Sequence, residues 1–287
     1  METGANNISL KVNFSSSLNN ILTEKYHLSI EVSLDHFAFT ILDTLTYTYK
    51  LLKVFEINAK GIKNRCKKIL DIINTEKILQ KEFYSSSLAL NNFPSTLIPI
   101  PFYKEEQKKQ VLSFNHEIYE EILTDKIQNI DAFNIYSIPK DLQNIIHSSF
   151  PNTQIKCFSS ILIDQLLVQN KENEEKVVYA SINRRNIEVC VIGNNQLEFY
   201  NRFETDSKED ILYFLLFTYE QLELSPDKIE LILLDDILES DEQYNLLYQY
   251  IRNISFGKRP ENLQYSQDIN SIKPHQYFCL FSQVLCA

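Results

Sequence analysis

The chain contains one pattern twice, 150 positions apart, and this repetition limits the folds it can adopt. The first copy covers residues 28–41 and the second covers residues 178–191. In both copies apolar residues alternate with other residues on either side of a short turn, which is the period-two pattern of a β-hairpin. A third alternating stretch and then a helical pattern follow each hairpin. The sequence therefore predicts two copies of one β-β-β-α unit.

The two copies align residue by residue. The aligned apolar residues are Leu28, Ile30 and Val32 with Val178, Ala180 and Ile182, and then Phe37, Phe39 and Ile41 with Ile187, Val189 and Val191. This alignment makes Glu31 equivalent to Ser181 and Ser33 equivalent to Asn183. It predicts that the two turns face one cleft between two domains.

Length and composition allow one domain or two, and the duplication favours two. A chain of 287 residues with 44% hydrophobic side chains can bury one large core or two ordinary ones. A Phe-Pro-Asn sequence at 150–152 ends a predicted helix and marks the expected boundary. We therefore predict an N-terminal domain in residues 1–152, with a polar extension over about the first 26, and a C-terminal domain in residues 153–287.

Local signals predict further elements. Ser207 with Asp210, and Ser240 with Gln243, have the spacing of residues that begin helices. The nearly continuous apolar run at 229–234 indicates a strand covered on both faces, as in a parallel sheet. Residues 155–158 predict a strand that opens the second domain. Residues 275–286 have helical spacing, although a strand is the alternative there.

The charge balance argues against some partners. There are 38 acidic and 28 basic residues, and the net charge of −10 disfavours nucleic acid and anionic membranes. Five cations lie within residues 60–68, where they can contact nucleic acid or an acidic partner, or form the solvated start of a helix. Because no aromatic residue is interleaved with them, we favour the solvated helix. We expect no nucleic-acid partner.

The sequence also predicts the compartment and the state of the cysteines. No apolar run approaches the roughly 20 residues that span a bilayer, and the first residues lack the pattern of a signal peptide. We therefore expect a cytoplasmic protein without membrane insertion. The five cysteines, at 66, 157, 190, 279 and 286, form no C-x-x-C pair. We expect reduced thiols and no metal site, because clustered ligands are absent.

Several segments carry a resemblance to a known family. They are residues 96–99, 135–142, 201–203 with 209–213, 229–234, and 244–251. Through them the chain resembles an uncharacterised bacterial family of unknown function with the actin-like ATPase fold. It is more distantly similar to the actin-like proteins of type IV pilus and secretion assembly. The resemblance implies an α/β chain with two ribonuclease-H-like α/β domains, each with a mixed sheet. None of these segments is a catalytic motif.

The chain departs from the active members of this fold where nucleotide would bind. Active actin-like ATPases place an Asp-x-Gly turn after the first strand of each domain and a Gly-Gly turn after a later strand of the second. Glycine lets the backbone approach phosphate closely, and the Asp holds the metal or its waters. The matching positions here are Glu31 and Ser33, Ser181 and Asn183, and Asp235 and Asp236. The resemblance thus implies a degenerate nucleotide site, and we expect no cofactor.

Glycine usage supports this expectation. A chain of this length would carry about 20 glycines at ~7% usage. This chain has four, at positions 4, 61, 193 and 257, and no two have the spacing of a phosphate-binding loop.

Two constellations have a functional and a structural interpretation. Asp35 and His36 suggest an acid–base pair, but Asp is common in turns for backbone reasons. The carboxylates at 235, 236, 239, 241 and 242 suggest a cation site, or a solvated loop leading into the N-terminus of a helix. We favour the structural interpretation of both and expect no catalytic residue. The 16 tyrosines and 18 phenylalanines are expected in cores, and any exposed group of them would mark a partner surface.

These observations lead to one functional hypothesis and one alternative. The hypothesis is a catalytically inactive actin-like protein that binds or scaffolds a protein partner in the cytoplasm. The alternative is an enzyme that binds nucleotide or another small ligand in the interdomain cleft through non-standard residues. A ribonuclease-H-type hydrolase would need several converging carboxylates on strands, and only Glu31 is suitably placed. The identity of the partner and the oligomeric state stay open.

Overall fold

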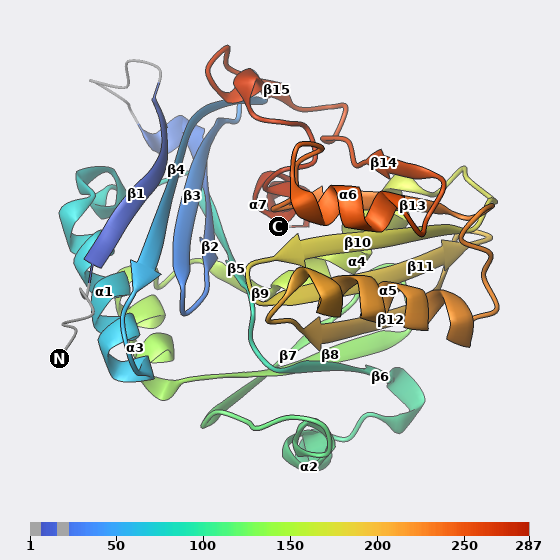
Figure 1. Ribbon diagram of the computed structural model, residues 1–287. Helices are drawn as coiled ribbons and strands as arrows, with labels where there is room; N and C mark the ends of the chain where they lie inside the picture. The colour runs from blue at the N-terminus through green and yellow to red at the C-terminus, as the bar shows by residue number, and fades with distance from the viewer. Residues whose placement is uncertain (1–6, 16–22, 287) are drawn as a thin grey trace, which may run out of the picture. The chain divides into compact units, whose positions relative to one another are not determined.

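The computed structural model describes residues 7–15 and 23–286 (Figure 1). These residues form two compact units. The first unit extends to Ile161 and also contains Glu261–Ser271 and the segment that begins at Cys279. The second unit contains Leu162–Pro260 and Ile272–Phe278.

The first unit is built on a mixed sheet with the order β1-β4-β3-β2-β5-β9, and β15 lies beside β4. Its strands are β1 (Asn7–Ser15), β2 (Tyr26–Val32), β3 (His36–Asp43), β4 (Thr48–Asn58), β5 (Ser85–Leu90), β9 (Gln154–Cys157) and β15 (Gln264–Tyr265). The pairs β1–β4, β4–β3 and β3–β2 are antiparallel, and the pairs β2–β5 and β5–β9 are parallel. Strand β2 is thus antiparallel to one neighbour and parallel to the other.

Helices α1 (Ile62–Thr75) and α3 (Lys140–Ser149) cover one face of this sheet (Figure 1). The predicted apolar stripe of α1 is buried at Ile69, Ile72 and Ile73, in the same cluster as Leu142 of α3. The cluster also contains the inward phenylalanines of the hairpin. Short 3-10 turns flank the sheet, η1 (Thr23–Lys25) before β2 and η2 (Lys77–Gln80) after α1. The apolar residues that alternate along the strands and those that recur along the helices therefore pack in one core.

A smaller antiparallel sheet, β6-β8-β7, also belongs to the first unit. It consists of β6 (Ser95–Pro99), β8 (Ala132–Ile138) and β7 (Glu121–Lys126), with η3 (Ile100–Phe102), η4 (Glu105–Gln107) and α2 (Lys108–Ser113) following β6. The proline-containing strand β6 lies at an edge, where the missing N–H groups leave no gap in the ladder. Strand β7 was not predicted, because its residues do not alternate cleanly.

The second unit repeats the topology of the first. Its sheet has the order β12-β11-β10-β13-β14. The strands are β10 (Val177–Asn183), β11 (Asn186–Gly193), β12 (Gln196–Glu204), β13 (Glu230–Asp235) and β14 (Ile254–Phe256). Helices α5 (Lys208–Gln221) and α6 (Glu242–Tyr248) lie side by side on one face of it (Figure 1). In both units the first strand of the hairpin, β2 or β10, lies between an antiparallel and a parallel neighbour, so the predicted duplication of a mixed α/β unit is confirmed.

The first sheet takes in segments that the sequence analysis placed elsewhere. Strand β9, expected to open the second domain, pairs with β5. The end of the chain forms α7 (Phe278–Ser282) and η6 (Gln283–Cys286), after η5 (Ile269–Ser271). It returns to the first unit because the Tyr49 ring packs against Phe281 with centroids 4.8 Å apart and against Tyr265 at 5.5 Å. Within the predicted polar extension, residues 7–15 form edge strand β1 and residues 23–25 form η1, while residues 1–6 and 16–22 lie outside those described.

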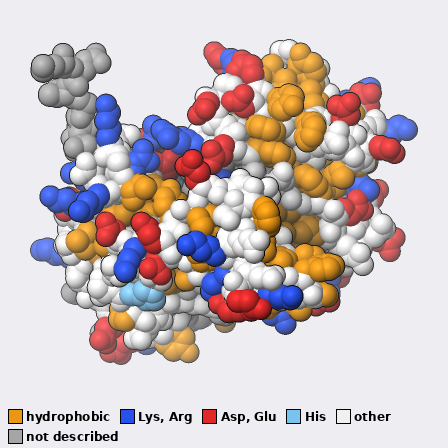
Figure 2. Space-filling view, turned by 90° about the horizontal axis from the view of Figure 1, so that it is seen from below, with side chains coloured by type: hydrophobic (Ala, Val, Ile, Leu, Met, Phe, Trp, Pro, Cys, Tyr) orange, Lys and Arg blue, Asp and Glu red, His pale blue; other side chains and the backbone are white. Residues whose placement is uncertain are grey.

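Helix α4 (Phe158–Gln169) is buried apart from its last two residues, although five of its twelve side chains are polar, and its residues are divided between the two units. All five cysteines are buried free thiols. Within the part of the chain that the structure describes, no helix is long and apolar enough to cross a membrane. Figure 2 shows that several groups of apolar side chains nevertheless reach the surface.

The two predicted helix caps differ in outcome. Ser207 begins α5 with a complete capping box, in which its Oγ accepts from Asp210 N at 3.1 Å and the Asp210 carboxylate accepts from Ser207 N at 2.9 Å. The prediction for Ser240 was wrong, because the N-cap of α6 is Asp241 and its carboxylate instead accepts from Leu238 N at 2.7 Å.

We predict that Ser207→Ala lowers the free energy of unfolding by about 1 kcal/mol, since it leaves an amide of the first turn of α5 without its acceptor. Ser240→Ala is the matched control, because this exposed serine does not cap α6. Urea denaturation of the two variants measures the difference. An equal loss in both would contradict the capping role of Ser207.

Candidate functional site

The two hairpins have the same register. Val32 pairs with Phe37 and Ile182 pairs with Ile187, so four residues separate the partners at the same position of each hairpin, and the second hairpin adds one more pair, Asn183 with Asn186. Glu31 therefore occupies the position in β2 that Ser181 occupies in β10, as the sequence alignment predicted. That both turns face one cleft stays a prediction.

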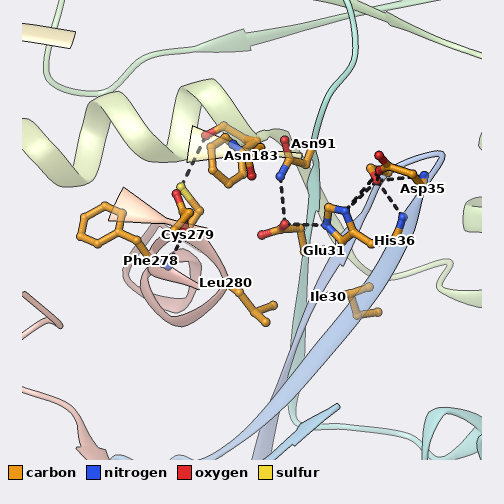
Figure 3. A network of polar contacts seen from close by, with 12 residues as sticks. Ile30, Glu31, Asp35, His36, Asn91, Asn183, Phe278, Cys279 and Leu280 are labelled. Carbon is orange, nitrogen blue, oxygen red and sulfur yellow. Dashed lines mark hydrogen bonds and ion pairs between the residues drawn. The ribbon is translucent and has the colours of Figure 1, made fainter. Parts of the chain in front are cut away.

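The first turn holds a compact polar network (Figure 3). His36 Nε2 lies 2.8 Å from Glu31 Oε1, and His36 Nδ1 lies 2.8 Å from Ser33 Oγ. The Ser33 hydroxyl donates to the Asp35 carboxylate. Glu31 Oε1 also accepts from Asn91 Nδ2 at 3.0 Å. The sequence suggested Asp35 and His36 as an acid–base pair. In the structure the His36 ring lies between two carboxylates, those of Glu31 and Asp35.

The protonation of His36 decides what this network can do. Burial lowers the pKa of the imidazole, but hydrogen bonds and charge interactions with Asp35 and Glu31 outweigh it and raise the pKa from 6.5 to about 10. At neutral pH the ring is therefore an imidazolium that donates from both nitrogens. It has no lone pair to accept the Ser33 proton, so this Ser-His-Glu geometry does not activate a nucleophile.

The backbone of the first turn is also held in place. Ser33 Oγ accepts from the amide nitrogens of Asp35 at 3.2 Å and of His36 at 3.0 Å. Arg65, in the basic stretch that begins α1, donates to the carbonyl of Leu34 at 3.4 Å. At least one cation of that stretch is therefore structural. The turn is thus held by its own side chains and by a contact from α1.

Asn91 was missed by the sequence analysis, although a signal for it exists. It follows β5 directly, and its amide donates to the carbonyl of Val32 at 2.9 Å. Polar residues directly after parallel strands are where α/β sheets place ligand contacts. In the second unit Asp236 holds the same backbone position, since its amide donates to the carbonyl of Ile182 at 2.8 Å.

The second turn is held by a different set of contacts, which contains one carboxylate and no side-chain cation. Ser181 Oγ donates to Asp235 Oδ2 at 2.6 Å and accepts from Asn183 Nδ2 at 3.3 Å. The other oxygen of Asp235 accepts from the amide of Phe278 at 3.0 Å. The structure thus brings Ser181, Asn183 and Asp235 together within the second unit, while the side chain of Asp236 is exposed.

Asp235 adopts a backbone conformation that favours glycine. Its φ is +66°, in the left-handed region, where Asp and Asn are the side chains best tolerated. Only 8% of the residue is exposed. A nucleotide phosphate at this turn would meet a buried negative charge, and one at the first turn would meet a carboxylate that already has His36 as its cation. These residues do not fit a magnesium–nucleotide complex.

The acidic cluster at 235–242 does not converge on one point. Asp235 bonds to Ser181, Asp241 bonds to the Leu238 amide, and Glu242 pairs with Lys208 Nζ at 2.6 Å. Among the residues that the structure describes, no group of three or more His, Cys, Asp or Glu side chains is arranged to hold a metal ion.

Another buried carboxylate, outside both turns, was not predicted. Asp125 of β7 accepts from Tyr136 Oη at 3.0 Å, from Cys157 N at 2.6 Å and from Ser160 Oγ at 2.8 Å. Burial raises the pKa of Asp125, and these donors oppose that rise. The residue lines a cavity of about 170 Å³ that also contains His147. Because its donors come from three different elements, no local sequence signal could identify it.

A family model described as protein of unknown function (DUF3822) matches residues 15–254. The chain belongs to this family. No curated protein matches this DUF3822 chain in sequence.

Solved structures show the fold of the DUF3822 chain. A protein of unknown function from Bacteroides thetaiotaomicron VPI-5482 with an actin-like ATPase fold is 20% identical, with a TM-score of 0.77 over 92% of this chain and 97% of that one. A chain of the PilM–PilN type IV pilus biogenesis complex is 9% identical, with a TM-score of 0.57 over 90% of this chain and 98% of that one. The DUF3822 chain has the actin-like ATPase fold, as its resemblance implied.

We predict a pH-dependent contribution of His36 to stability. Because the folded state raises its pKa from 6.5 to about 10, this contribution is complete below pH 6.5 and is lost as the pH rises through 10. The difference in free energy of unfolding between the native chain and His36→Gln should therefore shrink as the pH rises across this interval. Urea titrations of both proteins measure it, and a difference that does not change with pH would refute the charged state.

We also predict that Asp235→Ala is more destabilising than Asp235→Asn. Alanine loses both side-chain hydrogen bonds and adds about 1–2 kcal/mol of left-handed backbone cost, whereas asparagine tolerates the conformation and keeps an acceptor. Ser181→Ala, which removes only the donor, isolates the hydrogen-bond part. In thermal unfolding of the three variants, the melting temperature of Asp235→Ala should be lower than that of Asp235→Asn. Equal melting temperatures for the two Asp235 variants would exclude a role for the backbone conformation.

Proposed function

We propose that this chain is a catalytically inactive actin-like protein that acts in the cytoplasm by binding a protein partner. The observation that carries the proposal is the first turn. Where active members of the fold keep a carboxylate available for a metal ion, Glu31 is paired with the His36 imidazolium and with Asn91. A charge that the chain neutralises itself attracts no metal–phosphate complex.

The later turn of the second unit supports the same proposal. Active members use glycine there, and this chain has the left-handed Asp235, whose carboxylate is held by Ser181 and by the amide of Phe278. Gly257 lies close to the same strand. A Cβ there would lie 2.2 Å from Leu234 Cδ2, so a larger residue would require the Leu234 side chain to move.

The similar solved structures are consistent with a role in binding proteins. One of them is a chain of the PilM–PilN type IV pilus biogenesis complex, and PilM and PilN are there bound to each other. With 38 acidic and 28 basic residues, this chain is better suited to a protein partner than to nucleic acid.

We predict that millimolar ATP with magnesium does not raise the melting temperature. A ligand at 100 times its dissociation constant would add about 2.7 kcal/mol, which differential scanning fluorimetry detects easily. Magnesium chloride alone and magnesium with inorganic triphosphate are the controls. A saturable upward shift that requires ATP would overturn the proposal and favour the alternative, an enzyme that uses non-standard residues.

A further inference from the structure

The negative charge of this protein is concentrated in one segment. Residues 204–250 contain 13 acidic and 2 basic side chains, so this segment has a net charge of −11, and the whole chain has a net charge of −10. The rest of the chain has 25 acidic and 26 basic side chains and is nearly neutral. The acidic segment lies within the second unit and includes α5 and α6. The acidic character of the chain is therefore a local property of this unit.

Helix α5 is apolar on its outer as well as its inner side. Residues 211–217 are seven consecutive apolar residues, which is more than a helix on one face of a sheet needs. On the inner side Ile211, Leu215 and Thr218 are buried, and Phe214 and Leu222 are partly buried against the same core. The outer positions Tyr213 and Phe217 remain 61% and 41% exposed.

The outer stripe of α5 has a defined pattern. Glu209, Tyr213, Phe217 and Glu220 follow one another at helical spacings of four, four and three, and all four are exposed. The rings of Tyr213 and Phe217 stack with centroids 6.1 Å apart. The stripe therefore has an aromatic centre and an acidic residue at each end.

Helix α6 adds to this surface. It lies beside α5 (Figure 1), and Lys208 of α5 pairs with Glu242 of α6. Tyr248 is 61% exposed, and its ring stacks on that of Tyr244 with centroids 6.1 Å apart. We call the exposed residues of the two helices the α5–α6 face. Exposed aromatic side chains grouped in this way are typical of contact surfaces.

The charge around the aromatic residues determines what fits there. A second copy that met this face with its own α5–α6 face would bring two strongly acidic surfaces together, which is unfavourable. A basic partner gains from the same charges. Lysine and arginine side chains pair with the carboxylates and also interact with aromatic rings, while apolar side chains cover Tyr213 and Phe217.

We propose that the α5–α6 face docks a basic amphipathic helix of a partner protein. This inference rests on the proposed protein-binding function and specifies its surface. The apolar stripe of such a helix lies on Tyr213, Phe217 and Tyr248, and its cations face Glu209 and Glu220. This is the helix-on-surface mode of recognition, with the acidic ends fixing orientation.

The test uses a labelled synthetic peptide of about 15 leucine and lysine residues, with leucine at helical spacing. Its fluorescence anisotropy is followed as the full chain is added. Tyr213→Gln with Tyr248→Gln removes the aromatic rings, and Glu209→Gln with Glu220→Gln removes the charges while leaving the rings. Tyr84→Gln with Glu82→Gln is the matched control, because both residues are exposed in the first unit.

We expect both α5–α6 variants to weaken binding at least about tenfold and the control variant to leave it unchanged. The charge variant should also reduce the loss of affinity between about 50 and 500 mM salt. Melting temperatures show whether each variant is folded, and the charge variant serves as the test if the aromatic one is not.

Three results would overturn the docking proposal. They are equal affinity in all variants, equal binding of a peptide with the same residues in scrambled order, and a native dimer that the aromatic variant converts to monomer in sedimentation. Any of these three results would mean that the partner binds elsewhere. The proposed function would still hold, provided that ATP does not stabilise the protein. Stabilisation by ATP overturns the proposed function whatever the peptide does.

Discussion

The pairing of the first strand of each unit constrains the rest of this structure. Strands β2 and β10 each have an antiparallel neighbour on one side and a parallel neighbour on the other. The hairpin turn and the turn after the parallel strand must then meet at the same end of the sheet. Residues far apart in sequence, such as Glu31 and Asn91, or Ser181 and Asp235, are brought within hydrogen-bond distance by this pairing.

The two units use this shared geometry in different ways. In the first, two carboxylates and an imidazolium form a charged network, and His36 supplies the cation. In the second, the equivalent of Glu31 is Ser181, and a single carboxylate is satisfied by a hydroxyl and an amide. Removing His36 would leave Glu31 and Asp35 without their counter-charge, which is more costly than replacing the whole network by apolar residues. Both solutions fill the turns with the protein's own side chains.

Much of the fold was predictable because it depends on local periodicity. The hairpins, the inner stripes of α1 and α5 and the capping box at Ser207 all follow from spacing within one segment. Strand β9 was expected in the second domain, but it pairs with β5 of the first unit. A strand of four residues carries no local signal that identifies the strand it pairs with. Strand β7 was missed because Asp125 faces inward, where the donors that satisfy it come from Tyr136, Cys157 and Ser160. Such contacts have no sequence signature.

The site was predictable in its positions and not in its chemistry. Asp35 and His36 are adjacent in sequence, but their role depends on Glu31, which lies on the other strand of the hairpin. Glu31 and Asp35 together keep the His36 imidazole protonated. A similar limit applies to α5. Periodicity identified the residues that face the sheet, and Tyr213 and Phe217 were the apolar residues that this stripe did not use. Leu212 and Leu216 also pack against the core of the second unit, whereas Tyr213 and Phe217 remain exposed. On a helix with acidic residues at both ends of its outer face, such residues are better explained by a partner than by packing.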